Sequence, residues 1–106
     1  MKTPDLKLVI MDLKKTISQH PELVKRAGVF GSLATGKFTD KSDIDIAIEF
    51  AMDDNFDFER FAQFCEICER ITEDLSIEYD RHIDVIQIED NPRCLLHKIK
   101  NEVVWV

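Results

Sequence analysis

Residues 30–46 read FGSLATGKFTDKSDIDI, and the end of this stretch decides the fold of the chain. Asp43 and Asp45 alternate there with isoleucines. Because side chains alternate between the two faces of a strand, we expect a strand over residues 43–50 with both aspartates on one face. The isoleucines would then face a core that is covered by helices. The pattern predicts a strand with one apolar face and one acidic face.

The two aspartates are candidate metal ligands. Residues two apart on a strand are separated by about 6–7 Å, so Asp43 and Asp45 can share one divalent ion or flank a pair of ions. Hard oxygen ligands favour Mg²⁺, with Mn²⁺ as the alternative. A simpler interpretation is a turn cap at Ser42 followed by a half-exposed strand, since alternating polar residues are common on such strands.

Two further features favour the metal interpretation. The Gly31-Ser32 pair ends an apolar run and starts a turn, where backbone N–H groups and a hydroxyl can meet phosphate oxygens. Asp84 is the only acid inside the apolar run of a later strand and could supply a third carboxylate. These parts together suit phosphoryl or nucleotidyl transfer. The alternative for Asp84 is a salt bridge to Arg81 or His82.

Hydrophobic periodicity predicts a small α/β domain with a mixed sheet flanked by helices, in the order α-β-β-α-β-α-β, with residues 1–106 forming a single domain. A capping hydroxyl at Thr3 followed by Pro4 predicts the first helix start, and Asp53-Asp54-Asn55 predict the second. The expected elements are a helix over 4–19, a strand over 27–30, a loop over 33–41, a strand over 43–50, a helix over 56–75, a strand over 82–88, a helix over about 90–100 and a strand over 103–106.

The pattern Gly31-Ser32-x-x-x-Gly36, followed by Ser42-Asp43-x-Asp45, resembles the signature of the polymerase-β-like nucleotidyltransferases. Chain length and element order resemble the minimal branch of this family, the MntA-like antitoxins that are encoded beside HEPN-domain toxins. The resemblance implies that Asp43 and Asp45 bind Mg²⁺. It also implies that Asp84 completes the metal site, so that all three aspartates are catalytic.

The same resemblance implies that Gly31, Ser32 and Ser42 bind a nucleoside triphosphate. Members of the family transfer AMP from ATP, and the antitoxins modify a tyrosine of the partner toxin. One departure is that residues 33–35 are Leu-Ala-Thr, where many relatives carry arginines that neutralise triphosphate charge. Lys37 or Lys41 could take that role. The alternative function is an antitoxin that neutralises its toxin by contact, with weak or no turnover.

Composition limits the partners and the compartment. The net charge is −7, from 14 Lys+Arg and 21 Asp+Glu, and this acidity argues against binding duplex nucleic acid. No stretch of eighteen apolar residues and no leader pattern occurs, so we expect neither a membrane span nor secretion. An odd number of cysteines favours a reducing cytoplasm. Cys65-x-x-Cys68 and Cys94-x-x-His97 have zinc-ligand spacing, but a helix-patterned setting favours core cysteines.

The end of the chain favours association with another protein. Val103-Val104-Trp105-Val106 is predicted to be an apolar edge strand, and edge strands invite pairing or cover. A chain of this length also has few residues left after its core to build an acceptor site. We therefore expect a protein partner, with a homo-oligomer as a further option. The family resemblance implies that this partner is a helical toxin of the HEPN type.

Overall fold

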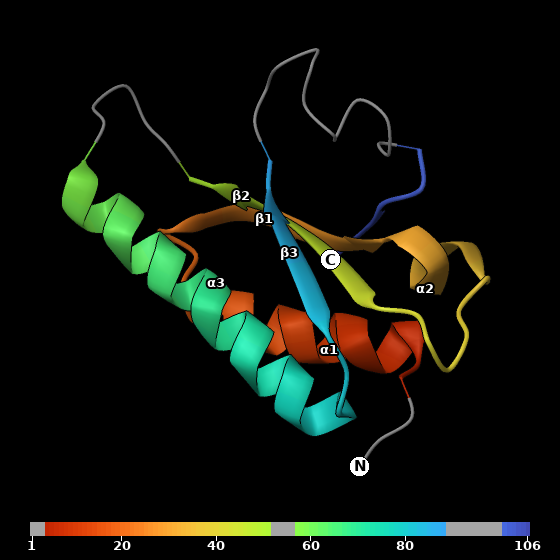
Figure 1. Cartoon of the computed structure of the whole chain (residues 1–106). Coiled ribbons are helices and arrows are strands. Elements are labelled where there is room, and N and C mark those ends of the chain that lie inside the picture. Colours follow the sequence, from red (N-terminus) through yellow and green to blue (C-terminus); the bar gives the residue numbers. More distant parts are fainter. Residues whose placement is uncertain (1–3, 52–56, 89–100) are drawn as a thin grey trace.

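The protein is described by a computed structural model, which covers residues 4–51, 57–88 and 101–106 (Figure 1). The elements in chain order are α1 (Leu6–Ile17), β1 (Val24–Phe30), α2 (Gly31–Thr35), β2 (Ile44–Phe50), α3 (Phe58–Tyr79), β3 (Ile83–Gln87) and β4 (Val104–Trp105). A single mixed sheet has the strand order β3-β2-β1-β4, with β2 parallel to β3 and the other pairs antiparallel. This architecture confirms the predicted α/β class with a mixed sheet.

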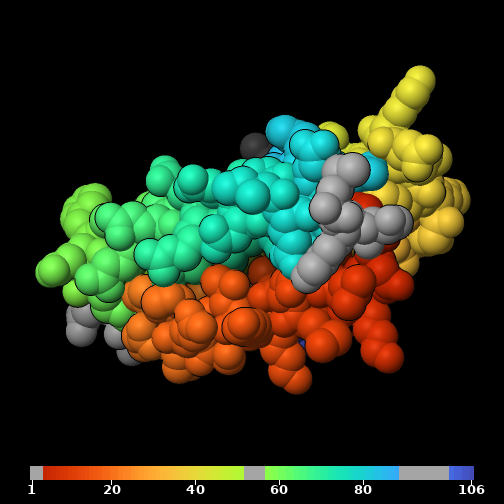
Figure 2. Space-filling view, turned by 90° about the horizontal axis from the view of Figure 1, so that it is seen from below, coloured from red at the N-terminus to blue at the C-terminus, as the bar shows by residue number. Residues whose placement is uncertain are grey.

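The main core lies between the sheet and the two long helices. Figure 1 shows α1 and α3 on the same side of the sheet, and Figure 2 shows them side by side over that face. Ile44, Ile46 and Ile48 of β2 are completely buried in this core, as their alternation with polar residues predicts. Tyr79 joins the two helices by donating a 2.6 Å hydrogen bond from its hydroxyl to Asp12. The isoleucine face of β2 is therefore the part of the sheet on which α1 and α3 pack to form the main core.

The opposite face of the sheet is less covered. Phe30, Ala47 and Ile88 form a second, smaller apolar cluster there. At its edge Trp105 lies against Gly28, where a Cβ atom would come within 3.1 Å of the indole and 2.7 Å of the Val104 carbonyl oxygen. The Arg26 guanidinium stands 4.3 Å from the centre of the indole ring. This face carries the polar side chains that the sequence singles out.

Most predicted boundaries shift by a few residues. The N-cap of α1 is Asp5, whose carboxylate accepts from the Lys7 amide at 2.8 Å. Strand β1 begins at Val24, which pairs with Phe50 of β2, and its charged residues Lys25 and Arg26 bind Glu49. Helix α3 runs on to Tyr79, because this side chain continues its buried face, and then stops where Asp80 adopts φ 48°. Thr3, Asp53-Asp54-Asn55 and the helix predicted over about 90–100 lie outside the described residues.

One predicted loop is wrong in its first part. Residues 31–35 form the short helix α2, not an irregular loop. Gly31 (φ 73°) and Gly36 (φ 81°) bound it, and both values fall in the left-handed region that glycine adopts at little cost. Leu33 is buried in the main core and anchors this single turn. Helix α2 thus places Gly31 and Ser32 at the end of β1, beside β2.

No helix within residues 4–51, 57–88 and 101–106 has the length and hydropathy needed to cross a membrane.

Candidate active site

Two of the predicted site aspartates are neighbours in the sheet. Asp45 on β2 and Asp84 on β3 are register partners in the parallel pair, and Phe30 is the partner of Asp45 on β1. Neighbouring strands lie about 5 Å apart, so the two carboxylates project side by side from the sheet face that α1 and α3 leave open. The topology thus unites carboxylates that are far apart in the sequence.

Gly31 packs directly against Asp45. A Cβ atom added to Gly31 would overlap the Asp45 carboxylate, and φ at this glycine is 73°. The absence of a side chain at Gly31 therefore gives the Asp45 carboxylate its place beside the first turn of α2. Glycine is required here both for space and for backbone conformation.

Asp43 lies just before β2 and is held by a histidine. The Asp43 Oδ2 atom lies 3.3 Å from the Nδ1 atom of His82, and the two side chains form an ion pair when the imidazole is protonated. Both side chains are more than half exposed. His82 directly precedes β3, so the starts of two neighbouring strands are joined at the proposed metal site.

The local electrostatic field at Asp45 suits a cation. Burial raises the pKa of the Asp45 carboxyl above its ordinary value, and the negative charges of Asp84 and Asp43 raise it further. Glu102, from the turn before β4, also raises this pKa, while His82 opposes the shift. Four carboxylates therefore act on one region, and this repulsion would be relieved by a divalent cation.

The donor set fits magnesium or manganese by its chemistry. Asp43, Asp45 and Asp84 offer hard carboxylate oxygens, which these ions prefer. Across the described ranges, however, no three His, Cys, Asp or Glu side chains are already gathered closely enough to hold a metal ion. The carboxylates are adjacent and mutually repulsive, so binding an ion requires side-chain movement toward it.

The predicted nucleotide-binding residues lie near this acidic cluster. Gly31 and Ser32 open α2, whose first N–H groups have no acceptor within the helix. The Ser42 hydroxyl accepts a 2.9 Å hydrogen bond from the Thr39 amide and so shapes the turn that leads to Asp43. Ser42 therefore has a structural contact in addition to the nucleotide role that the motif implies.

The position that follows Gly31-Ser32 could not hold an arginine in this packing. Leu33 is 7% exposed and belongs to the main core, while Ala34 packs against the same core. A charged side chain at position 33 would have to be buried without a partner, at a cost of several kcal/mol (about 3 or more). The leucine at position 33 is thus tied to how α2 is anchored.

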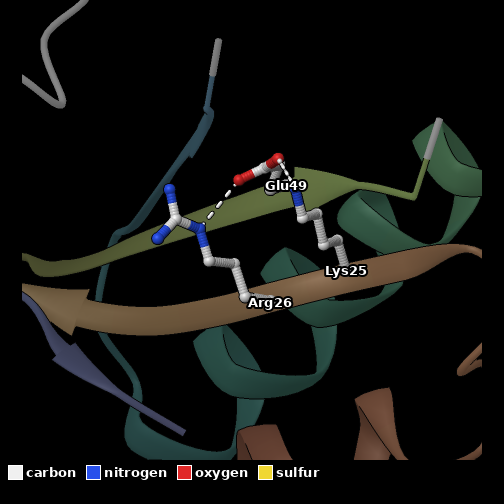
Figure 3. Close-up of polar contacts among 3 residues, drawn as sticks. All are labelled: Lys25, Arg26 and Glu49. Atoms are coloured by element: carbon white, nitrogen blue, oxygen red, sulfur yellow. Dashed lines mark hydrogen bonds and ion pairs between the residues drawn. The ribbon is translucent and has the colours of Figure 1, made fainter. Parts of the chain in front are cut away.

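Two further side chains, the carboxylate of Glu49 and the thiol of Cys68, lie away from this site. Glu49 points to the same sheet face as Asp45 but is bound by Lys25 at 3.4 Å and by Arg26 at 2.7 Å (Figure 3). Cys68 is a buried thiol in α3, and burial raises its pKa to about 12. Such a thiol stays protonated and serves as a core residue. Cys94 and His97 lie outside the described residues.

Sequence reasoning missed three residues around the site. The sequence suggested His82 only as a salt-bridge partner for Asp84, and it gave no signal for Glu102. Arg81 was considered only as a partner for Asp84, but it donates instead to three backbone carbonyls of the loop before Asp43. Its position next to the acidic strand, at the end of a long helix, is the only signal in the sequence that could have pointed to it.

A model of the family "Polymerase beta, Nucleotidyltransferase" matches residues 11–106. The chain therefore belongs to this family and is a nucleotidyltransferase, as the motif indicated. A relative from Methanocaldococcus jannaschii, named "Putative protein adenylyltransferase MJ1379", is 31% identical over 77 residues. The match spans 67% of this chain and 74% of the relative.

Solved structures support the fold. A crystal structure of a toxin–antitoxin with AMP-PNP superimposes with a TM-score of 0.61 at 19% identity, covering 90% of this chain and 69% of the other. A mutant of the toxin–antitoxin MntA-HpeT gives a TM-score of 0.60 at 17% identity, with the same coverage of 90% and 69%. At these identities the likeness shows a common fold.

The raised pKa of Asp45 leads to a prediction for stability. When the folded pKa exceeds the unfolded value, the folded state binds the proton more tightly. The associated stability is present below about pH 3.8 and is lost as the pH rises through the raised pKa. With a chelator present at neutral pH, the free energy of unfolding of Asp45→Asn should therefore be ~0.5–2 kcal/mol higher than that of wild type. Urea unfolding between about pH 3 and pH 7 measures the difference.

The advantage of Asp45→Asn should shrink toward acidic pH, where the wild-type carboxyl is neutral. Magnesium should stabilise wild type in a dose-dependent way by mass action, and the variant should lose most of this response. A variant that is equally or less stable at neutral pH would show that the carboxylates do not repel one another in the fold.

Proposed function

We propose that this protein is a magnesium-dependent adenylyltransferase that moves AMP from ATP to a hydroxyl, a tyrosine, of a HEPN-type helical toxin and so acts as its antitoxin. One observation carries the proposal: Asp45 and Asp84 are register partners on the open sheet face, and Asp45 packs against the glycine of the Gly-Ser pair. The names of the relatives, a protein adenylyltransferase and toxin–antitoxin structures, support the substrate and the partner.

The site residues would divide the work. Asp43, Asp45 and Asp84 hold the divalent cation, which when bound supplies positive charge against the triphosphate and the phosphorus under attack. Gly31 and Ser32 bind phosphate oxygens through the first turn of α2, and Ser42 supports the same nucleotide from the neighbouring turn.

The proposed transfer forms one bond and breaks one bond. The acceptor oxygen bonds to the α-phosphorus of ATP, and the bond from this phosphorus to the β-phosphate oxygen breaks, so that pyrophosphate leaves. Asp84 takes the proton of the acceptor hydroxyl as a general base.

The use of ATP and the free cysteines suit a cytoplasmic protein.

The test is incubation with labelled ATP, magnesium and the helical product of the neighbouring gene. Mass spectrometry should find one added AMP on a tyrosine of that partner. Transfer that does not depend on magnesium, or the absence of any label on the partner, would overturn the proposal.

The short edge strand β4 offers a place for the partner, or for a second copy of the chain, to pair.

A second function is favoured by one observation, the buried Leu33 at a position where the family resemblance implies an arginine. In this alternative the protein neutralises the toxin by binding alone. Asp43→Asn separates the two functions: catalysis predicts that the variant binds the partner but fails to neutralise it, and binding alone predicts full neutralisation. Co-purification measures binding, and growth of cells that express the toxin measures neutralisation.

A further inference from the structure

Arg81 collects the carbonyls of one turn. Its Nη1 atom donates to the carbonyl oxygens of Thr39 at 3.1 Å, Asp40 at 3.1 Å and Ser42 at 2.8 Å. One Nη1 nitrogen has two N–H groups, so at least one of them is shared between two carbonyls. Without the positively charged guanidinium of Arg81, the three converging carbonyl dipoles would repel one another. The conformation of this turn therefore depends on Arg81.

The guanidinium is also fixed in orientation. Its carbon atom lies 4.6 Å from the centre of the Phe38 ring, a stacking contact. The Nε–H group is buried and has no hydrogen-bond acceptor in the described part of the chain. A buried N–H group without an acceptor is unfavourable, so the side chain keeps this position because of its other contacts.

The backbone of Arg81 is anchored as firmly as its side chain. Asp80 ends α3 in the left-handed conformation, and the Arg81 amide donates to the Ser76 carbonyl. The residue therefore connects the end of α3 to the turn over Thr39–Ser42. Asp43 follows this turn directly, and its carboxylate meets His82, the neighbour of Arg81.

We infer that Arg81 is a positioning residue: by gathering the carbonyls of the Thr39–Ser42 turn it sets where Asp43 stands for cation and nucleotide binding. This inference rests on the proposed function. Arg81 does not touch the reacting groups, and it acts through Asp43. Residues that orient metal ligands commonly change metal affinity or activity by about 10–100-fold when they are replaced.

The chain offers a matched control in Arg60. This arginine also donates to backbone carbonyls, those of Glu22 and Ala51, and its guanidinium lies 5.6 Å from the Phe50 ring. Its contact with the Ala51 carbonyl lies just after the end of β2, whereas Asp43 lies just before the start of that strand. Arg60→Ala should therefore weaken the fold in the same manner as Arg81→Ala but leave the proposed cation site alone.

The first measurement is hydrogen exchange of the peptide that spans residues 37–43, and it needs no ligand. Arg81→Ala should speed exchange at the amides of this turn by about tenfold or more, while α1 keeps its rates. Arg81→Lys keeps the charge but not the planar stacking group, so it should give intermediate exchange. If Arg81→Ala fails to fold, Arg81→Lys carries the test. Unchanged exchange in the turn would overturn the inference.

The second measurement is the magnesium concentration that gives half-maximal thermal stabilisation. Arg81→Ala should raise it about tenfold relative to wild type, and Arg60→Ala should leave it unchanged. An equal rise in both variants would reduce Arg81 to a structural role. A wild-type protein without any magnesium response or AMP transfer would overturn the proposed function instead, while the exchange data would still show whether Arg81 holds the turn.

Discussion

Asp45→Asn is expected to lower the rate of the proposed AMP transfer to the partner by at least about a hundredfold, because it removes one charge from the carboxylate pair at the centre of the candidate site. The amide has nearly the same shape as the carboxylate, so the contact with Gly31 is retained. The loss should therefore appear with a fold that is intact or more stable. Mass spectrometry of the partner after incubation with ATP and magnesium measures the transfer.

Glu49→Gln is the matched control for this variant. Glu49 lies on the same face of β2, near the other end of the strand from Asp45, and Lys25 and Arg26 bind it there (Figure 3). The same change from carboxylate to amide should leave the transfer rate within about threefold of wild type, because it leaves the carboxylates of Asp43, Asp45 and Asp84 unchanged and distant sites act nearly independently. If both variants lost activity equally, overall charge and not the Asp45 site would explain the effect.

Gly31→Ala should have the second largest effect. The added Cβ atom would overlap the Asp45 carboxylate, and alanine is strained at φ 73°. Strain of this kind costs about 1–3 kcal/mol of unfolding free energy. Displacement of the carboxylate should lower the transfer rate by about tenfold or more. Urea unfolding and the transfer assay measure the two losses separately.

Gly36→Ala separates strain from displacement. Gly36 has φ 81°, close to that of Gly31, but a Cβ atom there would meet no other atom within 4 Å. This variant should lose stability to a similar extent and keep its transfer rate. Equal loss of activity in both glycine variants would show that backbone strain at α2, and not the position of Asp45, limits the reaction.

The alternation of apolar and polar residues was sufficient to predict the strands of the sheet. Local sequence patterns were not sufficient to predict the short helix α2. The alternation of isoleucine with polar residues defines β2, because the core rewards only one of the two faces. Helix α2 is one turn long, too short for a periodic signal, and is stabilised by burial of Leu33 in the tertiary structure. The same applies to the start of β1, where Lys25 and Arg26 interrupt the apolar pattern and their partner Glu49 is distant in the sequence.

The acidic residues of the site could be proposed from the sequence because a carboxylate in an apolar strand is unusual. Its surroundings could not, because they depend on contacts between distant segments. Arg81 meets carbonyl groups, which have no sequence signature, and Glu102 acts on Asp45 through space. The roles proposed for Asp43, Asp45 and Asp84 stay predictions until the variants are measured.

The parallel pairing of β2 with β3 also determines when the site forms during folding. The antiparallel β1–β2 hairpin is local and brings Gly31 to Asp45 early, whereas β3 reaches its place only after the chain has crossed over through α3. Pairings between distant segments form slowly, because the loop must close before the contact is gained. Asp84 thus arrives beside Asp45 late, once the isoleucine core is available to oppose the repulsion between them.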